Sequence, residues 1–264
     1  MTGPPGGAAP RGALVTTHAE PAMGTVFSFT AVRGALPPDA VQAALAAACR
    51  VLHHCDALFS TWDAASPVSR FRRGEATLGQ MPPEFPVVLQ ECHAAKEASE
   101  GWFDPWAMPG GFDPTGLVKG WAAERALDEL RGAGLPGGLI NGGGDVAAFG
   151  SPGDGGQRWR VGIRHPWRPD ALAGIVAATG AVATSGSYER GPHLVDPRTG
   201  QPATRVASAT VTGPRLTLAD ALATGVAVGG DEALPAVSRL AGYAAYLIRA
   251  DGSETSIGGI EFAR

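Results

Sequence analysis

The sequence is poor in several features that mark common classes of protein. It has three cysteines, Cys49, Cys55 and Cys92, and their spacing matches neither a disulfide framework nor a set of metal ligands. All three fall on helix-like patterns, so we expect small buried thiols, as in a reducing compartment. Lysine and arginine form no basic block, and the formal net charge is −4, which argues against nucleic acid as a partner.

Long apolar runs are also lacking. No stretch approaches the ~20 apolar residues that a membrane-spanning helix needs, so we expect no insertion into a membrane. Residues 1–20 contain no basic start followed by an apolar run and no cysteine that could carry a lipid. We therefore expect a cytoplasmic protein with a flexible N-terminal segment over residues 1–20, followed by a single domain over residues 21–264.

What the sequence has in abundance is turn formers, with 38 glycines and 22 prolines in 264 residues. Apolar residues recur at helical spacing over 39–59 and 84–99, and alternation over 25–33 predicts an early strand. Beyond residue 150, short candidate strands are separated by glycine and proline, and one of them, at 193–195, begins with a histidine. Helices first and strands later predict an α+β fold.

The stretch 101–131 is the most informative part of the chain. It contains the tripeptide Phe-Asp-Pro twice, and the second copy leads directly into a helix pattern. Asp113 lies on the loop before this helix and Lys119 in its first turns. Because free N–H groups at a helix start and a lysine both attract anions, the stretch is suited to hold a phosphate. The alternative is an ordinary helix capped by Asp113 or Thr115, with Lys119 in solvent.

A second candidate site lies on the helix expected after residue 217. Asp220 and Thr224 are four residues apart, so they share one helix face, and both offer oxygen ligands that suit a hard cation such as Mg²⁺. The alternative is structural. Thr217 and Asp220 match a helix-start box in which Asp220 only caps the helix, and Thr224 can bond back to its own helix.

Other polar segments are less specific. Ser185 lies in a turn of small hydroxyl residues that could donate to a phosphate, although an ordinary turn reads the same way. His193 starts a candidate strand and is the best candidate for a general base, although a lone histidine is more often structural. The three glycines at 142–144 permit close approach of a ligand, but no helix pattern follows as in a dinucleotide-binding fingerprint. A nucleophile elbow of the form G-x-S-x-G is absent, so a hydrolase triad is weakly supported.

Taken in order, these motifs resemble the ApbE-like family, the FAD:protein FMN transferases. The resemblance covers roughly residues 22–230. Its most specific pieces are His-x-x-Asp-Pro-x-Thr-Gly at 193–200 and Ala-Asp-Ala-x-x-Thr at 219–224. The other matching segments are residues 22–25, 60–62, 101–105, 113–120, 141–145 and 184–186.

The resemblance implies a compact, toroid-like α+β domain that binds FAD and a divalent metal, Mg²⁺ or alternatively Mn²⁺. It also implies transfer of the FMN half of FAD to a threonine hydroxyl of a target flavoprotein, with release of AMP. By position, Asp220 and Thr224 would bind the metal with their side chains and Gly116 with its carbonyl, while His193 would be the catalytic base. The FAD site would be lined by Met23, Trp62, Trp102, Phe103, Asp104, Asp113, Lys119, Ser185 and Val195.

The chemistry of these residue types agrees with that implication. Attack at a pyrophosphate depends on positioning and on neutralisation of charge, to which Lys119 would add a positive charge. Trp62 and Trp102 could pack on the flavin or adenine ring.

The sequence also departs from the family pattern in its central segment. The stretch between the first Phe-Asp-Pro and Asp113 is much shorter than is usual in the family, so part of the wall around the cofactor could be missing. Two alternatives stay open: a metal-dependent FAD pyrophosphatase in which water replaces the threonine, and a flavin-binding protein without turnover.

Overall fold

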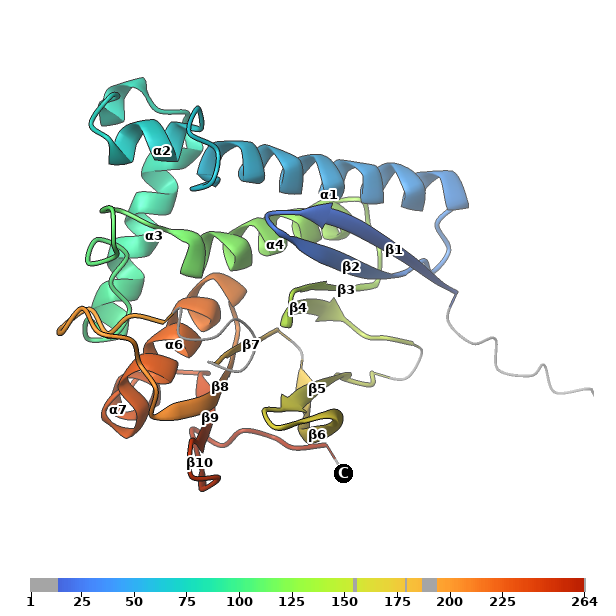
Figure 1. Ribbon diagram of the computed structural model, residues 1–264. Helices are drawn as coiled ribbons and strands as arrows, with labels where there is room; N and C mark the ends of the chain where they lie inside the picture. Colours follow the sequence, from blue (N-terminus) through green and yellow to red (C-terminus); the bar gives the residue numbers. More distant parts are fainter. Residues whose placement is uncertain (1–13, 154–155, 179, 187–193, 264) are drawn as a thin grey trace, which may run out of the picture.

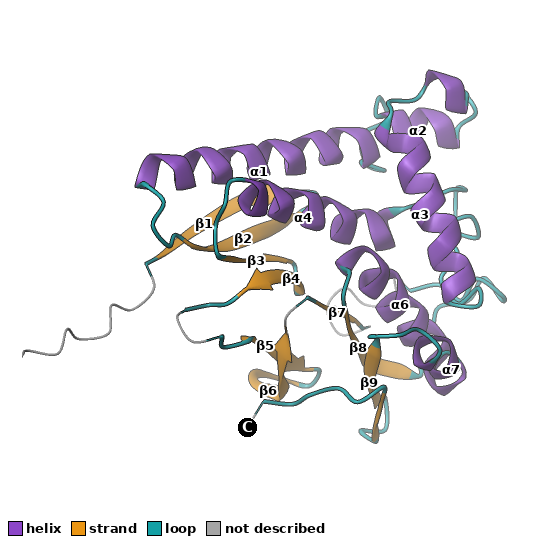
Figure 2. Ribbon diagram, turned by 180° about the vertical axis from the view of Figure 1, so that it is seen from behind, coloured by secondary structure: helices purple, strands orange, loops and turns teal. Residues whose placement is uncertain are grey.

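A computed structural model describes residues 14–153, 156–178, 180–186 and 194–263. Helices and strands are mixed along the chain (Figures 1 and 2), so the predicted α+β class is confirmed. The helices are α1 (Pro38–Phe59), α2 (Pro67–Arg72), α3 (Glu84–Ala98), α4 (Thr115–Gly132), α6 (Leu216–Gly229) and α7 (Leu234–Ser238), with short 3₁₀ turns η1 (Leu78–Gln80) and η2 (Gly230–Glu232).

The strands form a sheet of eight and a separate hairpin. The large sheet has the order β1-β2-β3-β4-β7-β8-β9-β10, and each neighbouring pair is antiparallel. Its strands are β1 (Val15–Ala22), β2 (Thr25–Val32), β3 (Gly137–Gly142), β4 (Asp145–Gly150), β7 (Ala181–Ser185), β8 (Val206–Gly213), β9 (Ala244–Arg249) and β10 (Glu254–Ile257). The hairpin pairs β5 (Trp159–His165) with β6 (Arg168–Ala178).

The helices cover one side of the large sheet. α4 contacts α1, α6 and the strands β3 and β4, so it lies between the long helix α1 and the sheet (Figure 1). α6 contacts α4 on one side and β7 and β8 on the other. The main core fills the space between these layers, and its largest fully buried side chains include Phe27, Phe29, Phe59, Phe85 and Leu117. All three cysteines are buried and unpaired, as the sequence predicts.

Two sequence-based predictions need correction. Residues 15–20, expected in the flexible N-terminal segment, belong to β1, which pairs with β2 along its whole length. Of the strand predicted at 193–195, His193 lies outside the described residues, and Val195 forms only an isolated bridge with Pro202. The glycines at 142–144 lead into the strand β4, which completes a hairpin with β3. Among the described helices, none combines the length and apolar character that crossing a membrane requires.

Candidate active site

The candidate site is built where α4 crosses α6 at close range. A Cβ atom added to Gly120 would lie 2.9 Å from the carbonyl oxygen of Leu216, so only a residue without a side chain fits here. The backbone N–H of Gly120 donates to Oδ2 of Asp220 at 3.2 Å. The crossing therefore holds the Asp220 carboxylate against α4, and the side chain is not part of a helix cap.

The start of α6 is capped from another helix. Glu124 on α4 accepts hydrogen bonds from the backbone N–H of Leu216 and from the hydroxyl of Thr217. The helix-start box considered for Thr217 and Asp220 is thus wrong, because Thr217 is already inside the helix and donates to Glu124. Asp220 is left to face the site.

Two buried carboxylates and one lysine meet beside this crossing. Lys119 on α4 forms an ion pair with Asp145 at the start of β4, and Asp145 Oδ1 also accepts from the N–H of Thr184 at 3.1 Å. Asp145 and Asp220 are both 3% exposed. Burial, together with the neighbouring Asp145, raises the pKa of Asp220 to about 7, against the opposing effects of Lys119 and the Gly120 N–H.

The surroundings of Asp220 fit a hard cation. Thr224, one turn further along α6, has its Oγ1 3.2 Å from Oγ of Ser185. A Cβ added to Gly116 on α4 would lie 3.6 Å from the same Oγ1, so all these groups are close. The donors are a carboxylate, hydroxyls and backbone oxygens, which suit Mg²⁺. When both are ionised, the buried carboxylates of Asp145 and Asp220 exceed the Lys119 ammonium by one negative charge, which a cation would balance.

These groups line one cavity of about 770 Å³. The predicted metal ligands and FAD-lining residues all border it: Met23, Trp62, Trp102, Phe103, Asp104, Asp113, Gly116, Lys119, Ser185, Val195, Asp220 and Thr224. They come from the β1–β2 turn, the loop after α1, the segment before α4, the elements α4, β7 and α6, and, for Val195, the segment between β7 and β8. The predicted base His193 directly precedes Leu194, which also borders the cavity.

The two tryptophans of the cavity are in different environments. Trp62 is 96% exposed and can offer a ring face to a ligand. Trp102 is 4% exposed; the Arg198 guanidinium lies 3.4 Å from its ring centroid, and a Cβ on Gly229 would come within 2.5 Å of its indole. Trp102 therefore supports the wall by packing, and its ring has little free face for stacking.

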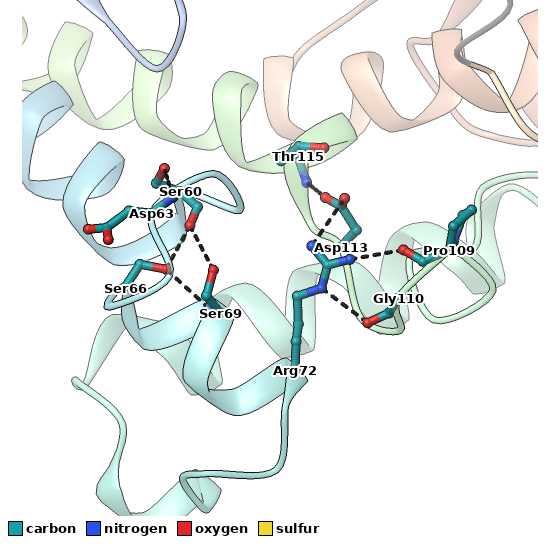
Figure 3. Close-up of polar contacts among 9 residues, drawn as sticks. All are labelled: Ser60, Asp63, Ser66, Ser69, Arg72, Pro109, Gly110, Asp113 and Thr115. Atoms are coloured by element: carbon teal, nitrogen blue, oxygen red, sulfur yellow. Dashed lines mark hydrogen bonds and ion pairs between the residues drawn. The ribbon is translucent and has the colours of Figure 1, made fainter.

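Arg72 on α2 fixes the shortened central segment (Figure 3). Its guanidinium donates to the carbonyls of Gly110 (3.3 Å) and Pro109 (2.9 Å), and it lies 3.7 Å from Oδ2 of Asp113. Oδ1 of Asp113 accepts from the N–H of Thr115 at 3.0 Å. The segment that was expected to leave a gap is thus anchored, and Asp113 is held at the start of α4. Sequence reasoning missed Arg72, since nothing in its local pattern marks it.

The loop that carries Trp62 is also anchored (Figure 3). The carbonyl of Ser60 accepts from the hydroxyls of Ser66 at 2.6 Å and Ser69 at 3.2 Å. These hydrogen bonds connect the end of α1 to α2, so they hold the backbone of the loop that carries the exposed Trp62.

A second cavity, of about 1060 Å³, adjoins the first. The two share Gly143 and Thr184 in their linings. The second cavity lies between the sheet strands β2–β4 and the β5–β6 hairpin, and exposed apolar side chains of Val26 and Leu172 border it. No sequence motif indicates this cavity, because its walls are brought together by the packing of the β5–β6 hairpin against the sheet strands.

The fold and this site define an ApbE-type protein. The ApbE family model matches residues 23–110 and 110–247, and the chain belongs to the ApbE family. The two matches meet at residue 110, within the shortened segment that Arg72 holds.

Two similar proteins have the name FAD:protein FMN transferase. The chain is 36% identical over 152 residues to a FAD:protein FMN transferase of Rhodobacter capsulatus, and the aligned region covers 54% of this chain and 29% of the relative. It is 36% identical over 151 residues to one of Klebsiella pneumoniae, covering 53% of this chain and 43% of the relative. The matches thus span less than half the length of either relative.

A solved structure supports the fold. The ApbE protein of Thermotoga maritima superimposes with a TM-score of 0.82 at 22% identity, over 93% of this chain and 97% of that one.

Proposed function

We propose that this protein transfers the FMN moiety of FAD to a threonine hydroxyl of a target flavoprotein and releases AMP, with Mg²⁺ as the required metal. The observation that carries the proposal is the convergence of Lys119, Asp220 and Thr224 in one cavity that the exposed Trp62 also borders. The names of the relatives in Rhodobacter and Klebsiella support the same reaction.

The protein's own groups suit FAD as the substrate. The first N–H groups of α4 and the Lys119 ammonium would attract the pyrophosphate, and Trp62 would stack on one of the ring systems. Lys119 is paired with Asp145, so it offers its charge from a fixed position.

Asp220, Thr224 and the carbonyl of Gly116 would hold the metal, since they supply the oxygen donors beside the excess negative charge described above. Bound there, Mg²⁺ would neutralise the charge that develops on the phosphate oxygens. The hydrogen bond from Gly120 fixes the Asp220 carboxylate before the metal arrives.

The transfer itself is a substitution at phosphorus. The threonine Oγ forms a bond to the phosphorus of the FMN half, and the bond from that phosphorus to the bridging oxygen breaks. AMP leaves with the electron pair of the broken bond. The hydroxyl proton passes to a base, for which His193 is our prediction from the sequence.

The acceptor would approach through the second cavity. Because the two cavities share Gly143 and Thr184, a chain segment lying along Val26 and Leu172 reaches the phosphate-binding region without crossing the helices. The identity of the acceptor as a flavoprotein follows from the proposed product. The cytoplasmic location predicted from the sequence stays a prediction.

Product analysis tests the proposal. The purified chain is incubated with FAD, Mg²⁺ and a fusion protein that displays a threonine acceptor segment, and the acceptor is followed by mass spectrometry. A gain equal to one FMN residue, lost in Asp220→Ala, is the expected result. Free FMN and AMP with an unmodified acceptor would establish the pyrophosphatase instead, and intact FAD would establish neither activity.

A further inference from the structure

A cluster of metal-binding side chains lies away from the candidate active site, between the edge strand β1 and the helix α1. The donor atoms of His18, Glu20 and Cys49 all lie within 4.8 Å of one another. His18 Nε2 is 3.1 Å from Glu20 Oε2, and His53 Nε2 is 2.7 Å from Glu20 Oε1. Three residues that commonly bind transition metals therefore have their donor atoms close together, and His53 is joined to them through Glu20.

The spacing of the four residues explains why they converge. His18 and Glu20 are two positions apart on β1, so both side chains leave the same face of the strand. Cys49 and His53 are four positions apart on α1, so they share one helix face. The strand face and the helix face meet because β1 packs against α1.

One side of the cluster is buried, and the other side is open to solvent. Cys49 is 9% exposed and anchors the inner side of the cluster. The side chains of His18 and His53 are 38% and 53% exposed, which leaves a path for an ion to enter. Without an ion, Glu20 holds the two imidazoles together through its two oxygens. None of the four residues is among those that line the candidate active-site cavity in the described chain.

We propose that His18, Glu20, Cys49 and His53 form a binding site for a transition-metal ion, with Zn²⁺ as the best match. A thiolate and two imidazoles favour a borderline or soft ion over Mg²⁺, and the mixture of sulfur, nitrogen and oxygen donors is typical of tetrahedral zinc. Zinc–ligand bonds of roughly 2.0–2.3 Å require donors about 3.3–3.8 Å apart. The donors of His18, Glu20 and Cys49, within 4.8 Å of one another, lie near that spacing, and His53 would supply the fourth ligand from its place beside Glu20. Binding would release the thiol proton and replace the hydrogen bonds of Glu20.

An ion at this position would join the edge strand to the helix. Among the described strands, β1 has a neighbour on one side only, and Met23, directly after it, borders the FAD cavity. Metal binding would therefore hold β1 on α1 and raise the temperature of unfolding, because the ion binds the folded chain only. The proposal does not depend on the flavin reaction.

The test measures metal binding by the full chain without a histidine tag. After incubation with Zn²⁺ and desalting, elemental analysis of the Asp220→Ala variant, which lacks the proposed Mg²⁺ ligand, should give one zinc per chain. Replacing Zn²⁺ with Co²⁺ should give a thiolate-to-cobalt charge-transfer band. Competition with a chromophoric zinc indicator should show affinity falling at least tenfold in Cys49→Ser and in His53→Gln.

The neighbouring His54 provides a matched control. Its side chain is 55% exposed, close to the 53% of His53. Its Nε2 lies 3.0 Å from Oε1 of Glu84, so His54, like His53, is a histidine on α1 paired with a glutamate of another element. Zinc affinity should be unchanged in His54→Gln. Equal affinity in all three variants, an absence of the cobalt–thiolate band, or an absence of zinc from the chain would each overturn the proposal. The band is measured on chains that retain both Cys49 and His53, so it decides the question even where a variant folds poorly.

Discussion

Asp220 on α6 accepts a hydrogen bond from the backbone N–H of Gly120 on α4, across 100 positions of sequence. This contact exists because Gly120 has no side chain at the point where the two helices cross. The crossing therefore has two roles. It packs α4 against α6 in the core, and it orients the Asp220 carboxylate that we assign to the metal.

The crossing predicts the effect of a single methyl group. Gly120→Ala should destabilise the protein by about 1–3 kcal/mol, because the new Cβ would lie 2.9 Å from the backbone of Leu216. FMN transfer should fall as Asp220 is displaced. Gly132→Ala, at the end of α4, is the matched control. Its Cβ would meet nothing within 4 Å, so stability should be unchanged or raised by about 0.4–1 kcal/mol. Urea unfolding curves of both variants check the prediction, and equal stability of the two would contradict the close crossing.

Asp220 also predicts how stability depends on pH in the absence of metal. Its folded pKa is raised from 3.8 to about 7, so the folded chain keeps a proton that the unfolded chain releases. The stabilising contribution is complete below about pH 4 and is lost as pH rises toward 7, at up to about 1.4 kcal/mol per pH unit. Asp220→Asn removes this dependence.

In a chelating buffer, the unfolding temperature of Asp220→Asn relative to that of the wild type should therefore increase as pH rises from 5 to 7.5. Adding Mg²⁺ should raise the unfolding temperature of the wild type and leave that of the variant unchanged. A difference between the two proteins that stays constant with pH would mean that Asp220 is ionised throughout this range.

The family, the α+β class and many of the residues that border the first cavity could be predicted from the sequence, because the relevant motifs are short and local. The order of Phe-Asp-Pro, Asn-Gly-Gly-Gly-Asp and Ala-Asp-Ala-x-x-Thr marks the segments that border the cavity, even though no spacing rule says that they meet. The helices α1 and α3 were also predictable within a residue or two, since their apolar faces recur at helical spacing.

What could not be predicted depends on contacts between distant segments. β1 has no apolar alternation, and only Ala22 in it is buried, so an edge strand was indistinguishable from a loose tail. The cap of α6 comes from Glu124, some 90 residues earlier, whereas the local sequence offered Thr217 and Asp220 as a plausible cap of their own. The anchoring of residues 109 and 110 by Arg72 is likewise a tertiary contact without a local signature.

Arg72 provides a prediction about the shortened segment. Arg72→Gln should raise the KM for FAD by roughly tenfold with a smaller change in kcat, because the lost bonds hold the cavity wall and Asp113 and do not touch the reacting atoms. Arg70, exposed on the same helix, is the matched control, and Arg70→Gln should leave both constants unchanged. Steady-state kinetics at varied FAD concentration would separate the two parameters. A fall in kcat alone would show that Arg72 acts on the chemical step and not on the wall.

The second cavity predicts a variant that separates FAD binding from acceptor modification. Leu172 is 54% exposed on β6, where its side chain borders the proposed path of the acceptor and lies outside the FAD cavity. Leu172→Asp replaces the apolar contact that Leu172 would offer the acceptor with a negative charge, so it should reduce acceptor modification about tenfold or more while FAD affinity stays unchanged. Leu78→Asp is the control, since Leu78 is 46% exposed on η1 and borders neither cavity. FAD affinity is measured by fluorescence titration and modification by mass spectrometry. If Leu172→Asp modified the acceptor as fast as Leu78→Asp, the acceptor would have to enter from the helical side of the cavity, past Trp62.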